Sequence, residues 1–151
     1  MRRYDFAKIT VAPYPNICDI NNKWIFTPDI TVVVNVSQKI KDKIKDAILK
    51  KGIAYYHFPL KEEVVDIGWN NVIKAAKVID EYLLAGGRVF IHCDGGNHRS
   101  RLVVEAYHYA KIRTHFVDEY KGYDNHLIYD CSLGYLLPLS EVEKVLKAMA
   151  I

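Results

Sequence analysis

The chain has 151 residues, of which 50% are hydrophobic and 26% are charged, and its formal net charge is +3. This length suits one domain with a substantial hydrophobic core, and this composition is ordinary for a soluble globular protein. The small net charge argues against a nucleic-acid partner, no apolar run approaches the ~20 residues of a membrane helix, and the basic N-terminus lacks the apolar stretch of a signal peptide.

Predicted strands and helices alternate along the chain. Short β-branched and aromatic runs predict strands, whereas apolar residues that recur every three or four positions predict helices. The strands are expected at residues 9–11, 29–36, 53–58 and 88–92, and the helices at about residues 37–52, 72–86, 99–112 and 142–149. Ser37 is the expected cap of the first helix. Residues 114–138, rich in Tyr and Asp, are expected to combine a loop with a short helix.

This alternation predicts an α/β fold in a single domain over residues 1–151. Parallel strands joined by helices form a mostly parallel sheet with helices on both faces. Ligands of such sheets bind beyond the carboxyl ends of the strands. The functional site is therefore expected in the loop that follows the strand at residues 88–92.

That loop has the sequence HCDGGNHRS, from His92 to Ser100. It joins the predicted strand to a predicted helix, and a strand, a glycine-containing loop and a helix start together form a cradle for anions. A cysteine at the base of such a cradle, here Cys93, is stabilised as the reactive thiolate. The planar guanidinium of Arg99 can hold two oxygens of an oxyanion. The segment therefore predicts phosphoryl transfer to sulfur.

The same segment resembles the signature loop of the protein tyrosine phosphatase superfamily, whose pattern is His-Cys-x-x-Gly-x-x-Arg-Ser/Thr. Its fixed positions are all matched, by His92, Cys93, Gly96, Arg99 and Ser100. The short chain looks like the compact dual-specificity branch. The resemblance implies a protein phosphatase that hydrolyses phosphotyrosine, and also phosphoserine or phosphothreonine, through a phosphocysteine intermediate. It implies neither a metal nor another cofactor.

The resemblance also assigns roles to individual residues. Cys93 would be the nucleophile, and Arg99 would bind the phosphate and stabilise its equatorial oxygens. Ser100 would help sulfur leave, and His92 would orient the loop. The backbone that surrounds the phosphate or another oxyanion would come from Asp94, Gly95, Gly96, Asn97, His98 and Arg99.

The general acid is expected upstream, in the loop that follows the strand at residues 53–58. A phosphate ester needs a proton on its leaving oxygen, and the superfamily usually takes it from an Asp about thirty residues before the cysteine. Here Glu62 aligns with that position, followed in rank by Asp66 and Glu63. The alternative interpretation is that this charged run is a solvated turn.

Three other interpretations of the chain remain open. One alternative is a catalytically inactive module that binds phosphoproteins, and another is an RNA 5′-triphosphatase of the same superfamily. A zinc site at the two histidines and the cysteine of the loop is disfavoured by their spacing.

Three widely spaced cysteines favour a reducing compartment, so the cytoplasm is expected. Cys18 and Cys131 are expected in the core or at its boundary. Phosphorylated proteins are the expected partners, and a membrane is not.

Overall fold

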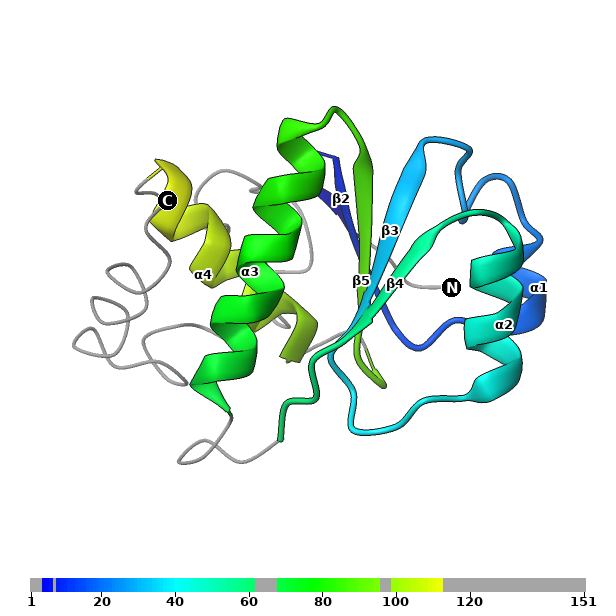
Figure 1. The fold of residues 1–151 in the computed structure, drawn as a ribbon, viewed down its shortest axis with the longest axis horizontal. Coiled ribbons are helices and arrows are strands. Elements are labelled where there is room, and N and C mark those ends of the chain that lie inside the picture. The colour runs from blue at the N-terminus through cyan, green and yellow to red at the C-terminus, as the bar shows by residue number, and fades with distance from the viewer. Residues whose placement is uncertain (1–3, 7, 62–67, 96–98, 113–151) are drawn as a thin grey trace.

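The computed structural model describes residues 4–6, 8–61, 68–95 and 99–112. Within these ranges strands and helices alternate, as Figure 1 shows. The strands are β1 (Tyr4–Phe6), β2 (Ile9–Ala12), β3 (Ile30–Asn35), β4 (Ala54–His57) and β5 (Arg88–His92). The helices are α1 (Ile17–Ile20), α2 (Asp42–Lys50), α3 (Trp69–Leu84) and α4 (Arg99–Ile112).

The strands form one sheet in the order β1-β2-β5-β3-β4. Strands β2, β5, β3 and β4 are parallel, and β1 pairs with β2 in the antiparallel direction. His92, the last residue of β5, pairs with Ala12 on one side and with Asn35 on the other. The carboxyl ends of β2, β5 and β3 are therefore level, and the segments that leave these strands meet at one edge of the sheet.

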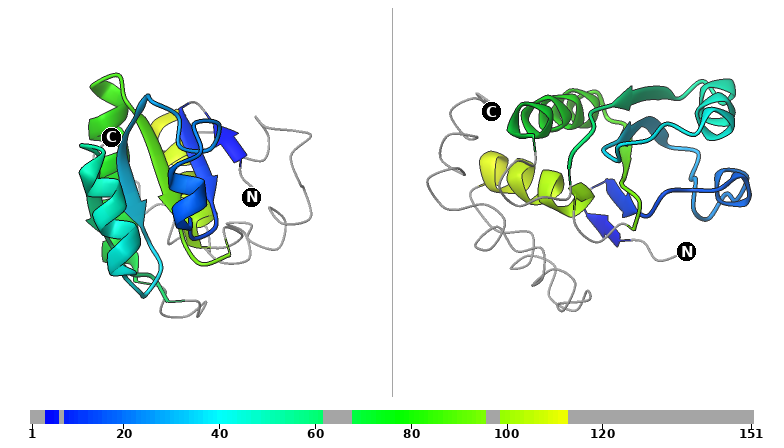
Figure 2. Two further views of the ribbon diagram at one scale, coloured as in Figure 1. Left: turned by 90° about the vertical axis from the view of Figure 1, so that its right-hand side faces the viewer. Right: turned by 90° about the horizontal axis from the view of Figure 1, so that it is seen from below.

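Helices cover both faces of the sheet, as the two views of Figure 2 show. Helices α3 and α4 pack against one face, where Val89 and Ile91 of β5 join their apolar residues in the larger core cluster. Helices α1 and α2 pack against the other face, where Phe90 lies in a second cluster. Successive residues of β5 thus alternate between two cores, as the pleat of a strand requires. The predicted fold class is confirmed.

The helix α2 begins later than the sequence predicts. Ser37 was the expected cap, but the residue before the helix is Lys41, which makes no side-chain capping bond. The Ser37 hydroxyl instead donates to the Lys39 carbonyl at 2.9 Å and bonds the Asn35 side chain at 2.7 Å. A serine side chain can satisfy a nearby turn as readily as a helix start, so local preference alone did not locate the boundary.

Two short elements were not predicted at all. The helix α1 is one turn long and carries a capping box, in which Asn16 and Asp19 bond each other's backbone N–H groups. This reciprocal pattern is visible in the sequence and was the available signal. The three-residue strand β1 is too short to show a period. Of the described helices, none has the length and apolar character needed to cross a membrane. The expected elements at residues 114–138 and 142–149 lie outside the described residues.

Candidate active site

The segment that resembles a phosphatase loop begins at the carboxyl end of β5 and ends at the first turn of α4. Cys93 directly follows the strand and is 2% exposed, whereas Asp94 and Gly95 are exposed. Arg99 and Ser100 are the first two residues of α4, and both are buried. Gly96, Asn97 and His98 lie outside the described residues. The sheet thus places a buried thiol at the base of a short connection to a helix N-terminus.

The thiol of Cys93 lies next to the hydroxyl of Ser100. Their Sγ and Oγ atoms are 3.3 Å apart, within hydrogen-bonding distance for sulfur. A hydroxyl in this position can donate to a thiolate, and a hydrogen bond to the charged form favours that form. The other described cysteine, Cys18, is exposed on α1 rather than part of the core or its boundary, which corrects the prediction. Cys131 lies outside the described residues.

The Arg99 side chain is held by two neighbours. Its Nη2 donates to the Asp94 carboxylate at 2.9 Å, and its Nη1 donates to the Leu60 carbonyl at 3.3 Å. The Arg99 side chain is 4% exposed, while the Asp94 side chain is 55% exposed. The guanidinium is therefore buried and already fixed in place, and it is paired with an anion from its own segment.

Asp94 is expected to compete with phosphate for Arg99. Its carboxylate accepts one of the N–H groups at the edge of the guanidinium, and its negative charge also repels an incoming dianion. We expect Asp94→Asn to lower the inhibition constant of inorganic phosphate about three- to tenfold, as suits the loss of one partly exposed ion pair. Inhibition of aryl phosphate hydrolysis at fixed ionic strength measures this constant. Asp29→Asn is the matched control, because Asp29 pairs with Arg88 at the opposite end of β5. Weaker phosphate binding in Asp94→Asn would show that Asp94 positions Arg99.

His92 holds the backbone of the cysteine segment in place. Its Nδ1 donates to the Cys93 carbonyl at 3.1 Å, and its own carbonyl accepts from the Val36 N–H at 2.9 Å. Its ring lies against that of Tyr14, with 4.3 Å between centroids. Burial lowers the pKa of His92 to about 4, and the positive charge of Lys41 acts in the same direction. The imidazole is therefore neutral at neutral pH and fixes the backbone of the cysteine as an uncharged donor.

This buried histidine predicts a loss of stability in acid. Between pH 6.5 and 4 the unfolded chain takes up a proton at His92 that the folded chain excludes, so the free energy of unfolding falls as the pH falls. The expected contribution is roughly 3 kcal/mol across that range. Urea titrations at several pH values measure it. We expect His92→Asn, which keeps a donor near Nδ1 but does not titrate, to show a shallower pH dependence. Equal slopes in both proteins would contradict the assignment.

The three candidate acids, Glu62, Glu63 and Asp66, lie outside the described residues. The residues on either side of these positions contact each other. The Asn71 side chain donates to the Pro59 carbonyl at 2.8 Å, and Gly68, at φ 101°, lies against Pro59 and Leu60. Glycine adopts this left-handed conformation without strain. Residues 59–60 and 68–71 therefore lie together, and Leu60 contacts Arg99.

Sequence reasoning missed three contacts of the site. Asp94 was expected to contribute only backbone, yet its carboxylate binds Arg99. The Leu60 carbonyl and the Tyr14 ring were not singled out, because nothing in their local sequence indicates contact with a loop more than thirty residues away. In the described part of the chain, no three His, Cys, Asp or Glu side chains are grouped as metal ligands would be.

Comparisons with known proteins agree on the fold. No family model matches the chain, and no curated protein sequence matches it. The crystal structure of PTPMT1 is 14% identical, with a TM-score of 0.66, and the match covers 96% of this chain and 93% of that one. The Yvh1 phosphatase domain from Chaetomium thermophilum is 17% identical, with a TM-score of 0.58 and coverage of 97% and 92%. The core catalytic domain of the PP-IP phosphatase SIW14 from S. cerevisiae, solved in complex with citrate, is 14% identical, with a TM-score of 0.56 and coverage of 91% and 79%.

These three proteins are cysteine-based phosphatases of the protein tyrosine phosphatase superfamily. Because their identity to this chain is low, the likeness establishes the fold and leaves the substrate open. The five residues that match the signature of the superfamily occur in this chain where a parallel strand passes into a helix. The chain thus has the fold of the cysteine-based phosphatases and carries their sequence signature at the carboxyl edge of its sheet.

Proposed function

We propose that residues 1–151 act as one catalytic domain, a cysteine-dependent phosphoric monoester hydrolase of phosphorylated proteins. Its substrates are phosphotyrosine and, through a shallow site, phosphoserine and phosphothreonine. The observation that carries the proposal is the group formed by Cys93, Ser100 and Arg99: a buried thiol, a hydroxyl 3.3 Å from it, and a buried guanidinium at the start of the same helix. The cytoplasm, a reducing compartment, keeps such a thiol active.

The proposed reaction has two steps. In the first, the Cys93 thiolate attacks phosphorus in line, an S–P bond forms, and the bond to the ester oxygen breaks as a general acid protonates that oxygen. In the second, the same carboxylate takes a proton from water, the water oxygen attacks phosphorus, and the S–P bond breaks. Arg99 and the backbone N–H groups of residues 94–99 stabilise the equatorial oxygens in both steps. Ser100 donates a hydrogen bond to the departing sulfur.

We assign the general acid to Glu62, with Asp66 and Glu63 next in rank. The contact between the Leu60 carbonyl and the Arg99 side chain, at 3.3 Å, supports this assignment. Glu62 follows Leu60 by two residues in the sequence, and the Leu60 carbonyl lies beside the guanidinium that would hold the phosphate. A glutamate is one methylene longer than the usual aspartate, and the loop must place it correspondingly farther from the phosphorus.

A single phosphate on a protein side chain fits the signature segment better than a heavily phosphorylated small molecule. The first variable position after the cysteine is Asp94, an anion that pairs with Arg99, where a lysine would favour additional phosphates. The citrate bound to SIW14 is in keeping with an anion site in this fold. If this chain lacked a functional general acid, it would bind phosphoproteins without hydrolysing them. If it were an RNA 5′-triphosphatase, its substrate would be the triphosphate end of an RNA.

Three substrates presented to the reduced protein in EDTA test the proposal: para-nitrophenyl phosphate, a phosphotyrosine peptide and a 5′-triphosphorylated RNA. We expect metal-independent release of phosphate from the first two, with a bell-shaped pH profile. Tight binding of the peptide without turnover would identify a binding module instead. Release of phosphate from the RNA alone would identify the triphosphatase.

A further inference from the structure

A wall of three residues stands beside the signature segment, on the face of the sheet that α1 and α2 cover. Tyr14, Lys39 and Lys41 make up this basic wall. The Tyr14 N–H donates to the Asp94 carbonyl at 2.9 Å, and the Tyr14 ring packs in the cluster of that face. Leu60, next to the candidate acids, packs in the cluster of the opposite face. The basic wall and Leu60 therefore belong to opposite faces of the sheet.

Hydrogen bonds fix the basic wall in position. The Tyr14 hydroxyl accepts from the Lys41 N–H at 2.8 Å and donates to the Lys39 carbonyl at 3.4 Å. The same carbonyl also accepts from the side chains of Asn35, at 2.8 Å, and Ser37, at 2.9 Å. These bonds fix the backbone of Lys39 and Lys41 before a ligand arrives, which lowers the entropy that this connection loses on binding.

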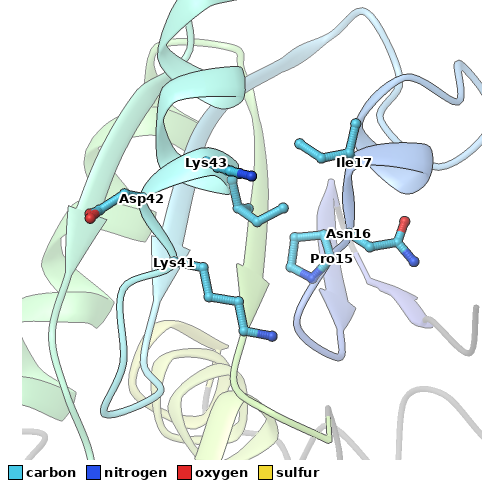
Figure 3. Close-up of a pocket in the computed structure, with 7 residues that line it drawn as sticks. Pro15, Asn16, Ile17, Lys41, Asp42 and Lys43 are labelled. Atoms are coloured by element: carbon cyan, nitrogen blue, oxygen red, sulfur yellow. The ribbon is translucent and has the colours of Figure 1, made fainter.

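The ammonium group of Lys41 lies against Tyr14, another residue of the basic wall. Its Nζ lies over the Tyr14 ring, 4.4 Å from the centroid, a favourable cation–π position. Asp42, the next residue, points away from the side on which Lys41, Pro15 and Ile17 lie (Figure 3). Residues 39–51 contain six lysines and two aspartates, a larger positive excess than the formal net charge of +3 for the whole chain. The connection before α2 and the helix itself therefore carry a positive excess, and Lys41 brings part of it to the Tyr14 ring, which contacts His92.

A cavity of about 410 Å³ continues from Lys41. It lies between the starts of α1 and α2, and Figure 3 shows the side chains that line it. These residues are Pro15, Asn16, Ile17, Lys41, Asp42, Lys43 and Ile44. A peptide that runs from the cysteine past Lys41 would thus reach an open space rather than packed protein.

We propose that Lys41, assisted by Lys39, determines specificity by binding an acidic residue that neighbours the phosphorylated residue of a protein substrate. The inference rests on the proposed function, since it places the phosphate at Cys93. A cationic, pre-fixed wall beside an anion site selects a ligand with two anionic groups a short distance apart. Because Lys41 is exposed, the contact should be modest and sensitive to salt.

Equilibrium binding to the Cys93→Ser protein tests this inference without any need for turnover. The probes are two phosphotyrosine peptides that differ only in having glutamates or glutamines on both sides of the phosphotyrosine. We expect the glutamate peptide to bind about three- to tenfold more tightly at low salt, and the preference to shrink as salt is added. We expect Lys41→Gln to remove most of this preference, and Lys39→Gln to add to the loss. Lys50→Gln, at the far end of the same helix, is the matched control and should retain it.

The outcomes separate the inference from the proposed function. Equal binding of the two peptides, or a preference that survives Lys41→Gln, would overturn the role of Lys41 even if the wild type is an active phosphatase. The binding preference could depend on Lys41 while the wild type hydrolyses neither peptide. That result would uphold the recognition of acidic phosphopeptides and overturn the proposed catalysis.

Discussion

Cys93→Ser is expected to lower kcat for para-nitrophenyl phosphate by at least about 10⁴-fold, because the variant lacks the nucleophile that splits the reaction into two steps. A serine hydroxyl has a far higher pKa than a thiol, so it is a much weaker nucleophile at neutral pH. The buried position of Cys93, 3.3 Å from the Ser100 hydroxyl, means that the substitution leaves the surroundings of the residue largely intact. Steady-state hydrolysis in EDTA and reductant measures the loss.

Cys18→Ser is the matched control for that experiment. Cys18 is the other cysteine that the structure describes, and it is exposed on α1. Its replacement should leave the rate unchanged, and alkylation by iodoacetamide should inactivate this variant and the wild type alike. Inorganic phosphate should slow the alkylation by occupying the site. Substantial residual turnover in Cys93→Ser would show that the sulfur is not the nucleophile.

Arg99→Lys is expected to lower kcat/KM for the same substrate by about 10²- to 10⁴-fold. Lysine keeps the positive charge but offers a point charge in place of a planar fork, and it cannot hold two phosphate oxygens at once. It also cannot keep both the hydrogen bond that Arg99 donates to Asp94 and the one that Arg99 donates to the Leu60 carbonyl. A single arginine that stabilises the transition state of phosphoryl transfer contributes about 10³- to 10⁵-fold, and the expected loss is smaller because lysine keeps the positive charge.

The corresponding control for Arg99→Lys is Arg88→Lys. Arg88 is the first residue of β5, at the end of the strand opposite to the cysteine, and it pairs with Asp29. We expect activity within about twofold of the wild type, since a partly exposed ion pair of this kind contributes little. A similar loss of activity in both variants would indicate that arginine substitutions act through stability rather than through the phosphate.

The regular elements could be predicted because their patterns are local. The run Arg88–His92 is bounded by Gly87 and by the cysteine segment, and the structure gives β5 those bounds. The start of α4 at Arg99 follows from the signature itself. The late start of α2 could not be predicted, because Ser37 satisfies its hydroxyl with Asn35 and the Lys39 carbonyl, one of which lies upstream in β3.

The long-range contacts of the site could not be predicted. Tyr14 contacts Asp94 and His92 because β2 lies beside β5 in the sheet. The order of strands in a sheet cannot be predicted from the local sequence of any one strand. The ion pair between Asp94 and Arg99 depends on how the segment turns, which the glycines leave open. The identity of the general acid stays a prediction, because Glu62, Glu63 and Asp66 lie outside the described residues.

The phosphocysteine itself is the most direct test of the account. Ser100→Ala should slow its breakdown, so the intermediate should accumulate when this variant turns over an excess of para-nitrophenyl phosphate. Denaturation during turnover, followed by proteolysis and mass spectrometry, locates the phosphate. The account predicts one phosphate on the peptide that contains Cys93, with a matching burst of nitrophenol. Turnover with no phosphoenzyme, or with the phosphate on another residue, would contradict it.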